Sequence, residues 1–201
     1  LYGVINNKYK IIPITSNIKY DLHIESNITT LLFMGSLNYA PNVEGINWFF
    51  DKVYSQINNK IYIIIAGKNP SIELKNKIKK FKNVTLFSNY ESLSDFVPQN
   101  TILVSPLFHG YGMKVKVSDA ISQGLRIIGN EETYVGYDKL VIDNKHFYKF
   151  HDENELINIL NSIDSQFNKN IRDDIIDIYN EYYSTNKSNK EIIDSLEELC
   201  R

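Results

Sequence analysis

The sequence predicts an α/β fold in which a doubly wound parallel sheet carries helices on both faces. Three observations lead to this prediction. Short apolar runs alternate with helical patterns after about residue 29, the runs are almost uninterruptedly hydrophobic, and each is bounded by Gly, Pro, Asn or Ser. Strands that are buried on both faces of a parallel sheet have this composition. A chain of 201 residues can also bury a sizeable core without help from a disulfide or a metal.

Five segments have the length and the β-branched composition of buried strands: 30–34, 61–66, 84–87, 102–104 and 126–128. Helical spacing of apolar residues between them predicts helices over 41–57 and 71–82, a short helix over 90–97, and a helix that begins near Met113. From residue 153 onward the pattern is helical, over 156–163, 171–183 and 189–199. The predicted order is therefore a strict alternation of strands and helices, followed by C-terminal helices.

The first 28 residues differ from the rest of the chain. The stretch KIIPITSNIKYD, residues 10–21, has a proline after an apolar pair and no long helical period. We interpret residues 1–28 as an entering strand and an interdomain linker, and residues 29–201 as one domain with C-terminal helices. Because residue 1 is Leu and not Met, we expect a further segment to precede it in the intact protein.

Composition excludes several classes of protein. With 22 basic and 24 acidic side chains, the chain lacks the excess of positive charge that nucleic-acid binding requires. The single cysteine, Cys200, excludes an internal disulfide and a cysteine metal cluster, and favours a reducing, cytoplasmic compartment. The apolar run 61–66 is far shorter than the roughly 18 residues of a membrane-spanning helix. We therefore expect a soluble protein.

Charge is distributed unevenly along the chain. Residues 60–82 contain seven lysines against one glutamate, whereas residues 152–201 contain twelve acids and five bases. We expect the lysines to form a solvated helix face. The alternative is that this basic segment makes peripheral contact with an anionic polymer or with the inner face of a membrane.

Ligands of doubly wound folds bind in the loops that lead from strands into helices. The first such loop, residues 35–42, lacks the three-glycine fingerprint of dinucleotide-binding domains. The loop at 67–69 lacks the first glycine and the final Ser or Thr of a phosphate-binding loop of NTPases. Both patterns argue against a nicotinamide, flavin or NTP-hydrolysing domain.

The loop after the fourth strand carries the strongest chemical signal. Two glycines, Gly110 and Gly112, allow close approach of a ligand, and the helix beginning near Met113 would direct N–H groups and its positive dipole end at that point. Lys114 and Lys116 add two cations, and Asp119 lies one turn further along, where a carboxylate can accept hydrogen bonds from a ribose diol. This set would recognise a diphosphate and a ribose. The alternative is a tight turn, solvated lysines and a helix-start aspartate.

Four segments, LLFMGSLNYAPNVEGINWFF, IYIIIAGKNP, NVTLFSNYESL and SPLFHGYGMKVKVSDAISQGLRIIG, resemble in this order the C-terminal half of GT-B glycosyltransferases, especially glycosyltransferase family 4. The resemblance runs from about residue 30 to residue 163, and KIIPITSNI resembles the preceding interdomain linker. It implies a Rossmann-like domain that binds a nucleoside-diphosphate sugar, in a retaining transferase that needs no metal or other cofactor. It also implies an N-terminal acceptor-binding domain that is absent here, a glycan or glycolipid acceptor, and no transfer activity of the 201 residues alone.

The resemblance also assigns roles to individual residues. Gly35 and Ser36 would face the diphosphate, and Ser88 and Asn89 would contact the base. The stretch from Gly110 to Lys116 would hold the diphosphate, with Lys114 and Lys116 stabilising the leaving phosphate during catalysis; its remaining members are Tyr111, Gly112, Met113 and Val115. Asp119 takes the place of the second glutamate of the family's glutamate pair, and His109 could contact a phosphate or the donor sugar.

The sequence departs from the family at several of these positions. Basic residues common in the family are missing at Ser36 and Asn42, Tyr111 replaces the first glutamate, and Asp119 is one methylene shorter than the second. These losses leave open a degenerate GT-B domain that serves as an interaction module. A GT-B nucleotide-sugar epimerase, which shares the diphosphate site, is a further alternative.

Overall fold

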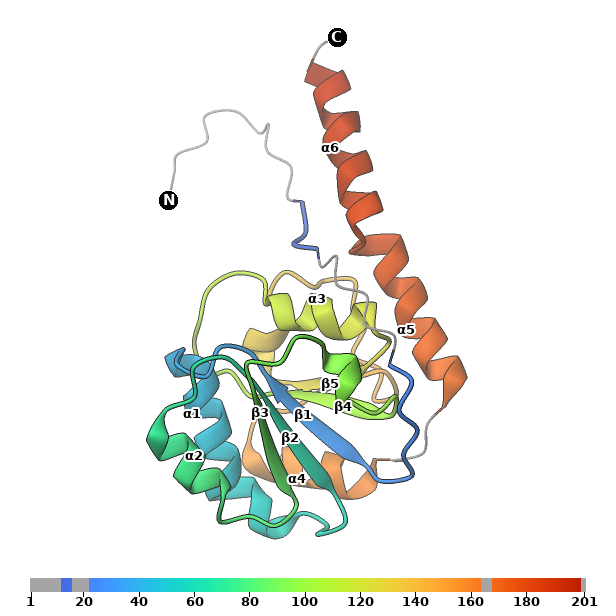
Figure 1. The fold of residues 1–201 in the computed structure, drawn as a ribbon. Helices are drawn as coiled ribbons and strands as arrows, with labels where there is room; N and C mark the ends of the chain where they lie inside the picture. The colour runs from blue at the N-terminus through green and yellow to red at the C-terminus, as the bar shows by residue number, and fades with distance from the viewer. Residues whose placement is uncertain (1–11, 16–21, 164–167, 200–201) are drawn as a thin grey trace.

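The computed structural model describes residues 12–15, 22–163 and 168–199. Its centre is a parallel sheet of six strands in the order β3-β2-β1-β4-β5-β6 (Figure 1). The strands are β1 Thr30–Met34, β2 Tyr62–Gly67, β3 Val84–Ser88, β4 Thr101–Ser105, β5 Arg126–Gly129 and β6 Phe147–Lys149. The predicted doubly wound fold is confirmed, and the five predicted strands differ from β1 to β5 by at most one residue at either end.

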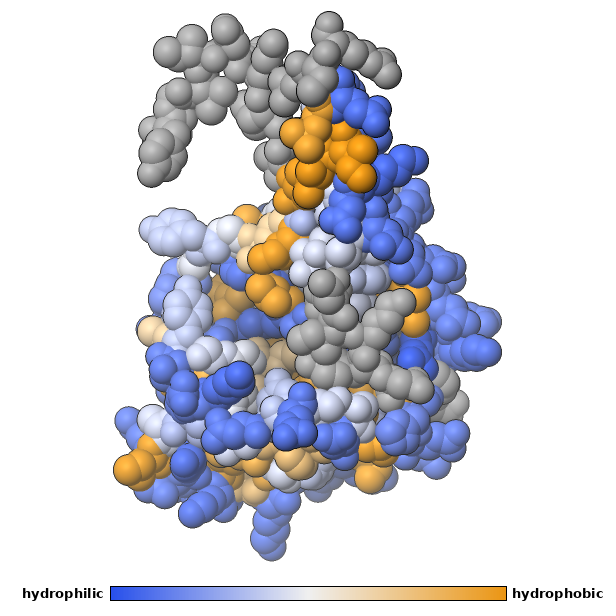
Figure 2. Space-filling model, turned by 45° about the horizontal axis from the view of Figure 1, so that its top comes forward, coloured by the Kyte–Doolittle hydropathy of each residue, from blue (hydrophilic) through white to orange (hydrophobic). Residues whose placement is uncertain are grey.

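Helices cover both faces of the sheet (Figure 1). One face packs against α1 Ala40–Trp48, α2 Ile72–Ile78 and α4 Glu153–Ser162, and the other against α3 Val115–Ser122 and α5 Lys169–Tyr182. Side chains alternate between the two cores along each strand: Leu31 of β1 lies in the first core and its neighbour Leu32 in the second. A last helix, α6 Thr185–Leu199, follows α5 away from the sheet. Apolar side chains are exposed on it (Figure 2), among them Ile192, Ile193 and Leu196. Within the described ranges, no helix is both long and apolar enough to cross a membrane.

The predicted C-terminal helices 156–163, 171–183 and 189–199 correspond to α4, α5 and α6, which begin two to four residues earlier. Three other predicted helices differ more in extent or type. The helix predicted over 41–57 is α1 followed by a π-helical turn, Phe49–Val53, and a 3-10 turn, Tyr54–Gln56. The helix predicted over 71–82 begins as expected, because the Ser71 hydroxyl accepts a hydrogen bond from the Leu74 N–H at 3.1 Å, but α2 ends at Ile78. The prediction of a helix over 90–97 is wrong beyond a single 3-10 turn, Leu93–Asp95.

The predicted linker lies partly outside the described residues. Within 10–21 the structure describes only 12–15, which have no strand conformation, so the entering strand stays a prediction. Further along, Leu22 is buried in the core, and Ile24 forms an isolated parallel bridge with Pro98. The chain is therefore attached to the domain before β1 begins.

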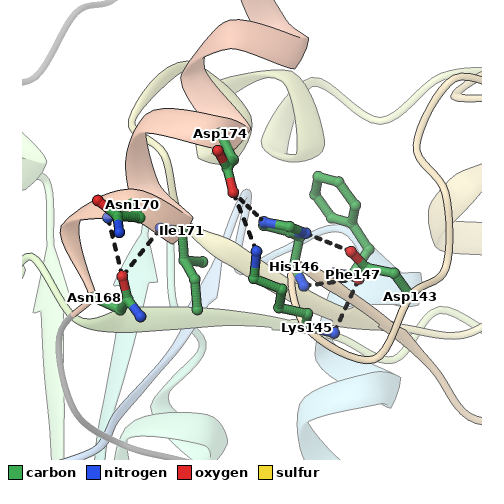
Figure 3. A network of polar contacts seen from close by, with 8 residues as sticks. All are labelled: Asp143, Lys145, His146, Phe147, Asn168, Asn170, Ile171 and Asp174. Atoms are coloured by element: carbon green, nitrogen blue, oxygen red, sulfur yellow. Dashed lines mark hydrogen bonds and ion pairs between the residues drawn. The ribbon is translucent and has the colours of Figure 1, made fainter.

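A polar cluster ties the edge strand β6 to α5 (Figure 3). The His146 ring bonds Asp143 through Nδ1, and its Nε2 lies 3.1 Å from the Asp174 carboxylate, which also accepts from Lys145 Nζ at 3.2 Å. Burial would raise the pKa of Asp143, but hydrogen bonds from His146 and from main-chain N–H groups outweigh it and lower the pKa to about 2. The cluster therefore gives His146 a structural role, since its ring joins the segment before β6 to α5.

Candidate functional site

The order of the strands determines where the candidate site lies. β1 and β4 are neighbours, but the chain leaves β1 toward β2 on one side and leaves β4 toward β5 on the other. The loops after these two strands therefore diverge and leave a crevice at the carboxyl end of the sheet, where doubly wound folds bind ligands.

A cavity of about 350 Å³ lies between these two loops. Its volume is in the range of small-molecule sites. The lining residues come from both loops, from the first turns of α1 and α3, and from the loop after β3: Met34, Gly35, Ser36, Tyr39, Pro41, Asn42, Tyr90, Leu107, His109, Gly110, Tyr111, Met113, Lys114, Val115, Lys116 and Asp119. The cavity thus brings together ten of the thirteen site residues predicted from the sequence.

The first loop is held tightly against the end of β2. Gly35, with φ of 136°, donates its N–H to the Ala66 carbonyl at 3.1 Å, and a Cβ on Gly67 would lie 1.9 Å from the Gly35 oxygen. The Ser36 hydroxyl donates to the Asn38 side-chain oxygen at 2.6 Å, and the Asn42 amide donates to the Ser36 carbonyl at 2.9 Å. The predicted Gly35 and Ser36 therefore form a compact wall of the cavity.

The second loop is anchored at its base. The Asn130 amide donates to the Leu107 carbonyl at 2.5 Å, and its oxygen accepts from the Leu107 N–H at 3.2 Å. Helix α1 packs directly on this loop, because a Cβ on Gly45 would lie 1.9 Å from the Pro106 carbonyl oxygen. Both loops and the start of α1 are therefore in direct contact around the cavity.

Left-handed glycines shape the rest of the second loop. Gly110 has φ of 139° and Gly112 has φ of 66°, conformations that other residues adopt only with strain. Gly112 itself does not line the cavity. Helix α3 then begins at Val115, two residues after the predicted start, with Lys114 as its N-cap and no side-chain cap. The Tyr137 hydroxyl fixes this start by donating to the Lys114 carbonyl at 2.7 Å.

Two lysines enter the cavity from the start of α3. Lys114 Nζ donates to the Gly112 carbonyl, and Lys116 Nζ donates across the cavity to the Asn42 side-chain oxygen, each at 2.6 Å. Burial and, second, the charge of Lys114 lower the pKa of Lys116 from 10.5 to about 8. The cavity therefore holds a positive charge that burial disfavours. A bound anion would stabilise this charge.

Asp119 lies one turn further along α3 and lines the same cavity. Its negative charge also acts on α5. Burial, and to a smaller extent the charge of Asp119, raise the pKa of Tyr179 on that helix. Burial also raises the pKa of Tyr137, and the charges of Tyr183 and then Asp119 add to this. The cavity thus combines two cations with one carboxylate, a set that can bind an anion and a hydroxyl-bearing group.

His109 makes an ion pair that the sequence did not predict. Its Nε2 lies 2.6 Å from the Glu44 carboxylate, which belongs to α1. Both side chains are slightly more than half exposed. Glu44 is 65 residues away in sequence and follows no recognised motif, so no signal in the chain pointed to it.

Two predicted base contacts lie outside the cavity. Ser88 and Asn89 are exposed at the end of β3 and do not line it, whereas the next residue, Tyr90, does. Sequence reasoning also missed Tyr39, which lies on the first loop. Tyr39 and Tyr90 both lie in loops that follow strands, and this position was the signal that could have identified them as cavity residues. Contact of Ser88 and Asn89 with a base stays a prediction.

Metal coordination has no obvious centre in the part of the chain that the structure describes. No group of three or more His, Cys, Asp or Glu side chains is placed there to hold an ion. Independence of metal stays a prediction.

Comparisons with known proteins add sequence and structural relatives. No protein-family model matches the sequence. A Klebsiella pneumoniae protein, described as an uncharacterized 44.6 kDa protein in cps region, is 31% identical over 148 residues, which is 66% of this chain and 38% of that protein. The relative is therefore much longer than the 201 residues.

Solved glycosyltransferase structures share the fold. Anabaena HepE in complex with UDP aligns with a TM-score of 0.68 and 14% identity, over 86% of this chain and 49% of HepE. A glycosyltransferase from Rickettsia africae gives 0.65 and 11%, over 88% and 49%. WaaG, a glycosyltransferase involved in lipopolysaccharide biosynthesis, gives 0.59 and 15%, over 87% and 51%. The chain spans about half of each, and it has the Rossmann-like fold of a GT-B glycosyltransferase C-terminal domain.

Proposed function

We propose that the chain is the donor-binding domain of a retaining glycosyltransferase that transfers a sugar from a nucleoside-diphosphate sugar to a glycan or glycoconjugate. The observation that carries this proposal is the cavity at the divergence of β1 and β4, where the glycine loop, the start of α3, two lysines and Asp119 meet. The HepE structure, which contains UDP, supports a uridine donor as the first to test.

The diphosphate would lie against the start of α3. Main-chain N–H groups and the positive end of the helix dipole favour an anion there, and Lys114 and Lys116 line the same space. As the anomeric bond breaks, negative charge grows on the leaving phosphate, and the two ammonium groups would stabilise it. Because these groups already supply positive charge, we propose that transfer needs no metal ion.

The nucleoside would extend from the diphosphate along α3. Asp119 is one turn beyond the lysines, where its carboxylate would accept hydrogen bonds from the ribose hydroxyls. The base would then lie toward the end of β3, near Tyr90, Ser88 and Asn89.

The acceptor would bind to a second domain. The chain spans about half of the glycosyltransferases that it resembles, so we propose that an N-terminal domain supplies the acceptor site and any catalytic base. Exposed aromatic side chains, Tyr39 at 51% and Tyr111 at 100% exposure, surround the cavity mouth and would face that domain. Transfer by the 201 residues alone is then not expected.

Calorimetric titration of the 201-residue chain with UDP, GDP and ADP tests the proposal. The double variant K114A/K116A should weaken binding by on the order of 2 kcal/mol, since a hydrogen bond to a charged group contributes about 1.5–3 kcal/mol. The matched control is K79A/K80A, which removes two exposed lysines outside the cavity. Equal affinity of K114A/K116A and the control would refute the site.

The same titration bears on the two alternatives. Absence of binding for every nucleoside diphosphate would favour an interaction module. If binding is found, incubation of the intact protein with a nucleoside-diphosphate sugar and no acceptor separates transfer from epimerisation, because only an epimerase would release a converted sugar.

A further inference from the structure

The ion pair between His109 and Glu44 lies at the mouth of the cavity and connects its two walls. His109 lines the cavity from the loop after β4, and Glu44 extends from α1 to within 2.6 Å of the ring. Because both side chains are more than half exposed, their attraction contributes little to folding. The main effect of this exposed pair is therefore on the histidine ring, because Glu44 determines which ring nitrogen carries a proton.

The geometry fixes the chemistry of the two ring nitrogens. A carboxylate can only accept, so Nε2 of His109 must carry a proton toward Glu44. The other nitrogen, Nδ1, is then the one available to a ligand: it accepts a hydrogen bond when the ring is neutral and donates one when the ring is charged. A carboxylate partner favours the charged form, in which both nitrogens donate.

We propose, on the basis of the proposed donor site, that Glu44 is a positioning residue that holds His109 as a third cationic group of the cavity, so that Nδ1 donates to a phosphate oxygen of the nucleoside diphosphate. Lys114 and Lys116 approach the diphosphate from the start of α3, and His109 would approach it from the loop on the other side of the glycines. Donor binding therefore gains a component that depends on both His109 and Glu44.

Charged and polar groups reach this loop from three segments. Glu44 of α1 contacts the His109 ring itself, whereas Lys114 at the start of α3 and Tyr39 of the first loop lie beside the next residue: a Cβ on Gly110 would lie 3.7 Å from Lys114 Cε and 3.8 Å from the Tyr39 hydroxyl. Glu44 is the charged group that contacts the ring, so removing it takes away the acceptor that holds a proton on Nε2.

Calorimetry with UDP at pH 6.0 and pH 7.5 tests the inference in wild type, E44Q, H109Q and the double variant. Both pH values lie below the pKa of Lys116, about 8, and titration of the ligand's own phosphate is common to all four proteins. At pH 6.0, E44Q and H109Q should each bind severalfold more weakly than wild type. The double variant should bind no more weakly than H109Q, because both changes remove one contribution.

The chain offers a matched control in a second histidine–glutamate pair. His151 Nδ1 lies 2.8 Å from Glu155, both side chains are well exposed, and neither lines the cavity. E155Q should leave UDP affinity at wild-type values at both pH values. Nitrogen NMR of the His109 ring at pH 8 gives a readout without ligand: wild type should carry its proton on Nε2, and E44Q should show a mixture of tautomers.

Three results would overturn the inference: UDP binding of E44Q that equals that of E155Q at both pH values, losses of E44Q and H109Q that multiply in the double variant, or an unchanged tautomer in E44Q. Binding that depends on Lys114 and Lys116 but not on Glu44 would refute this inference alone. Absence of UDP binding to the wild type would refute the proposed uridine donor and the inference together.

Discussion

Lys116 should make donor binding depend on pH in the alkaline range. Burial and the neighbouring Lys114 lower its pKa from 10.5 to about 8 in the ligand-free protein. A bound diphosphate favours the charged lysine, so its pKa should rise back toward the ordinary value. At pH 7 the ammonium form of Lys116 already predominates, whereas at pH 9 the lysine must take up a proton from the solvent when the ligand binds.

The size of the effect follows from these two values. If the pKa is about 8 in the free and about 10.5 in the bound protein, linkage predicts that affinity falls about tenfold between pH 7 and pH 9. The terminal phosphate of the ligand contributes little to this change, because its pKa is near 6 and it is ionised throughout the range. Any titration of the base is common to the wild type and to K116M, so their difference isolates Lys116.

Calorimetry with a nucleoside diphosphate at pH 7, 8 and 9 measures this change, with two variants as comparisons. K116M should bind weakly and with an affinity that is nearly constant across the range. K114M should retain the decrease but at higher pH, since removal of the Lys114 charge lets the pKa of Lys116 rise. Wild-type affinity that is equal at pH 7 and pH 9 would contradict the assignment of Lys116 to the anion site.

Three further predictions concern stability and the ribose. In the ligand-free protein K116M should raise the free energy of unfolding at pH 7 by about 1–2 kcal/mol, because the lowered pKa of Lys116 costs about 3 kcal/mol below pH 8 and the lost bond to Asn42 offsets about 1; urea unfolding should show the gain shrinking as pH rises from 8 toward 10.5. H146A should lower the unfolding free energy by about 1–3 kcal/mol, whereas H151A, at an exposed pair, should scarcely change it. For Asp119, the affinity penalty of a 2′-deoxy nucleotide should shrink in D119N; penalties that simply add would leave Asp119 only a structural role.

The sheet was predictable because its signal is local and strong. β1, β2, β4 and β5 are short hydrophobic runs with clear boundaries, and nearly all of their residues are buried, as in strands covered on both faces. β6 was missed because three residues are too few to show a period, and its strand conformation depends on pairing with β5. The segment predicted as a helix over 90–97 forms only the turn Leu93–Asp95, because it is short and Pro98 disfavours helical conformation in the residue before it.

The site was predictable where its chemistry lies in one segment. The glycines, the start of α3, both lysines and Asp119 fall within 110–119, and the structure gathers them as expected. The contacts that hold them come from far along the chain. Asn42 bonds Lys116 across 74 residues and Glu44 meets His109 across 65, so no pattern in the sequence could join them.

The bond between Lys116 and Asn42 also bears on the missing basic residues of the first loop. Ser36 and Asn42 stand where related transferases often carry cations, and their loss motivated the interaction-module alternative. Lys116 extends from α3 to within 2.6 Å of the Asn42 side-chain oxygen, so a cation still reaches the first loop, now from the opposite wall. Its lowered pKa means that the folded protein keeps this charge at a cost in stability. Such a lysine does not stabilise the fold, whereas its charge would bind a diphosphate in the cavity directly. The presence of Lys116 therefore favours the donor-binding function over a domain that has lost its ligand.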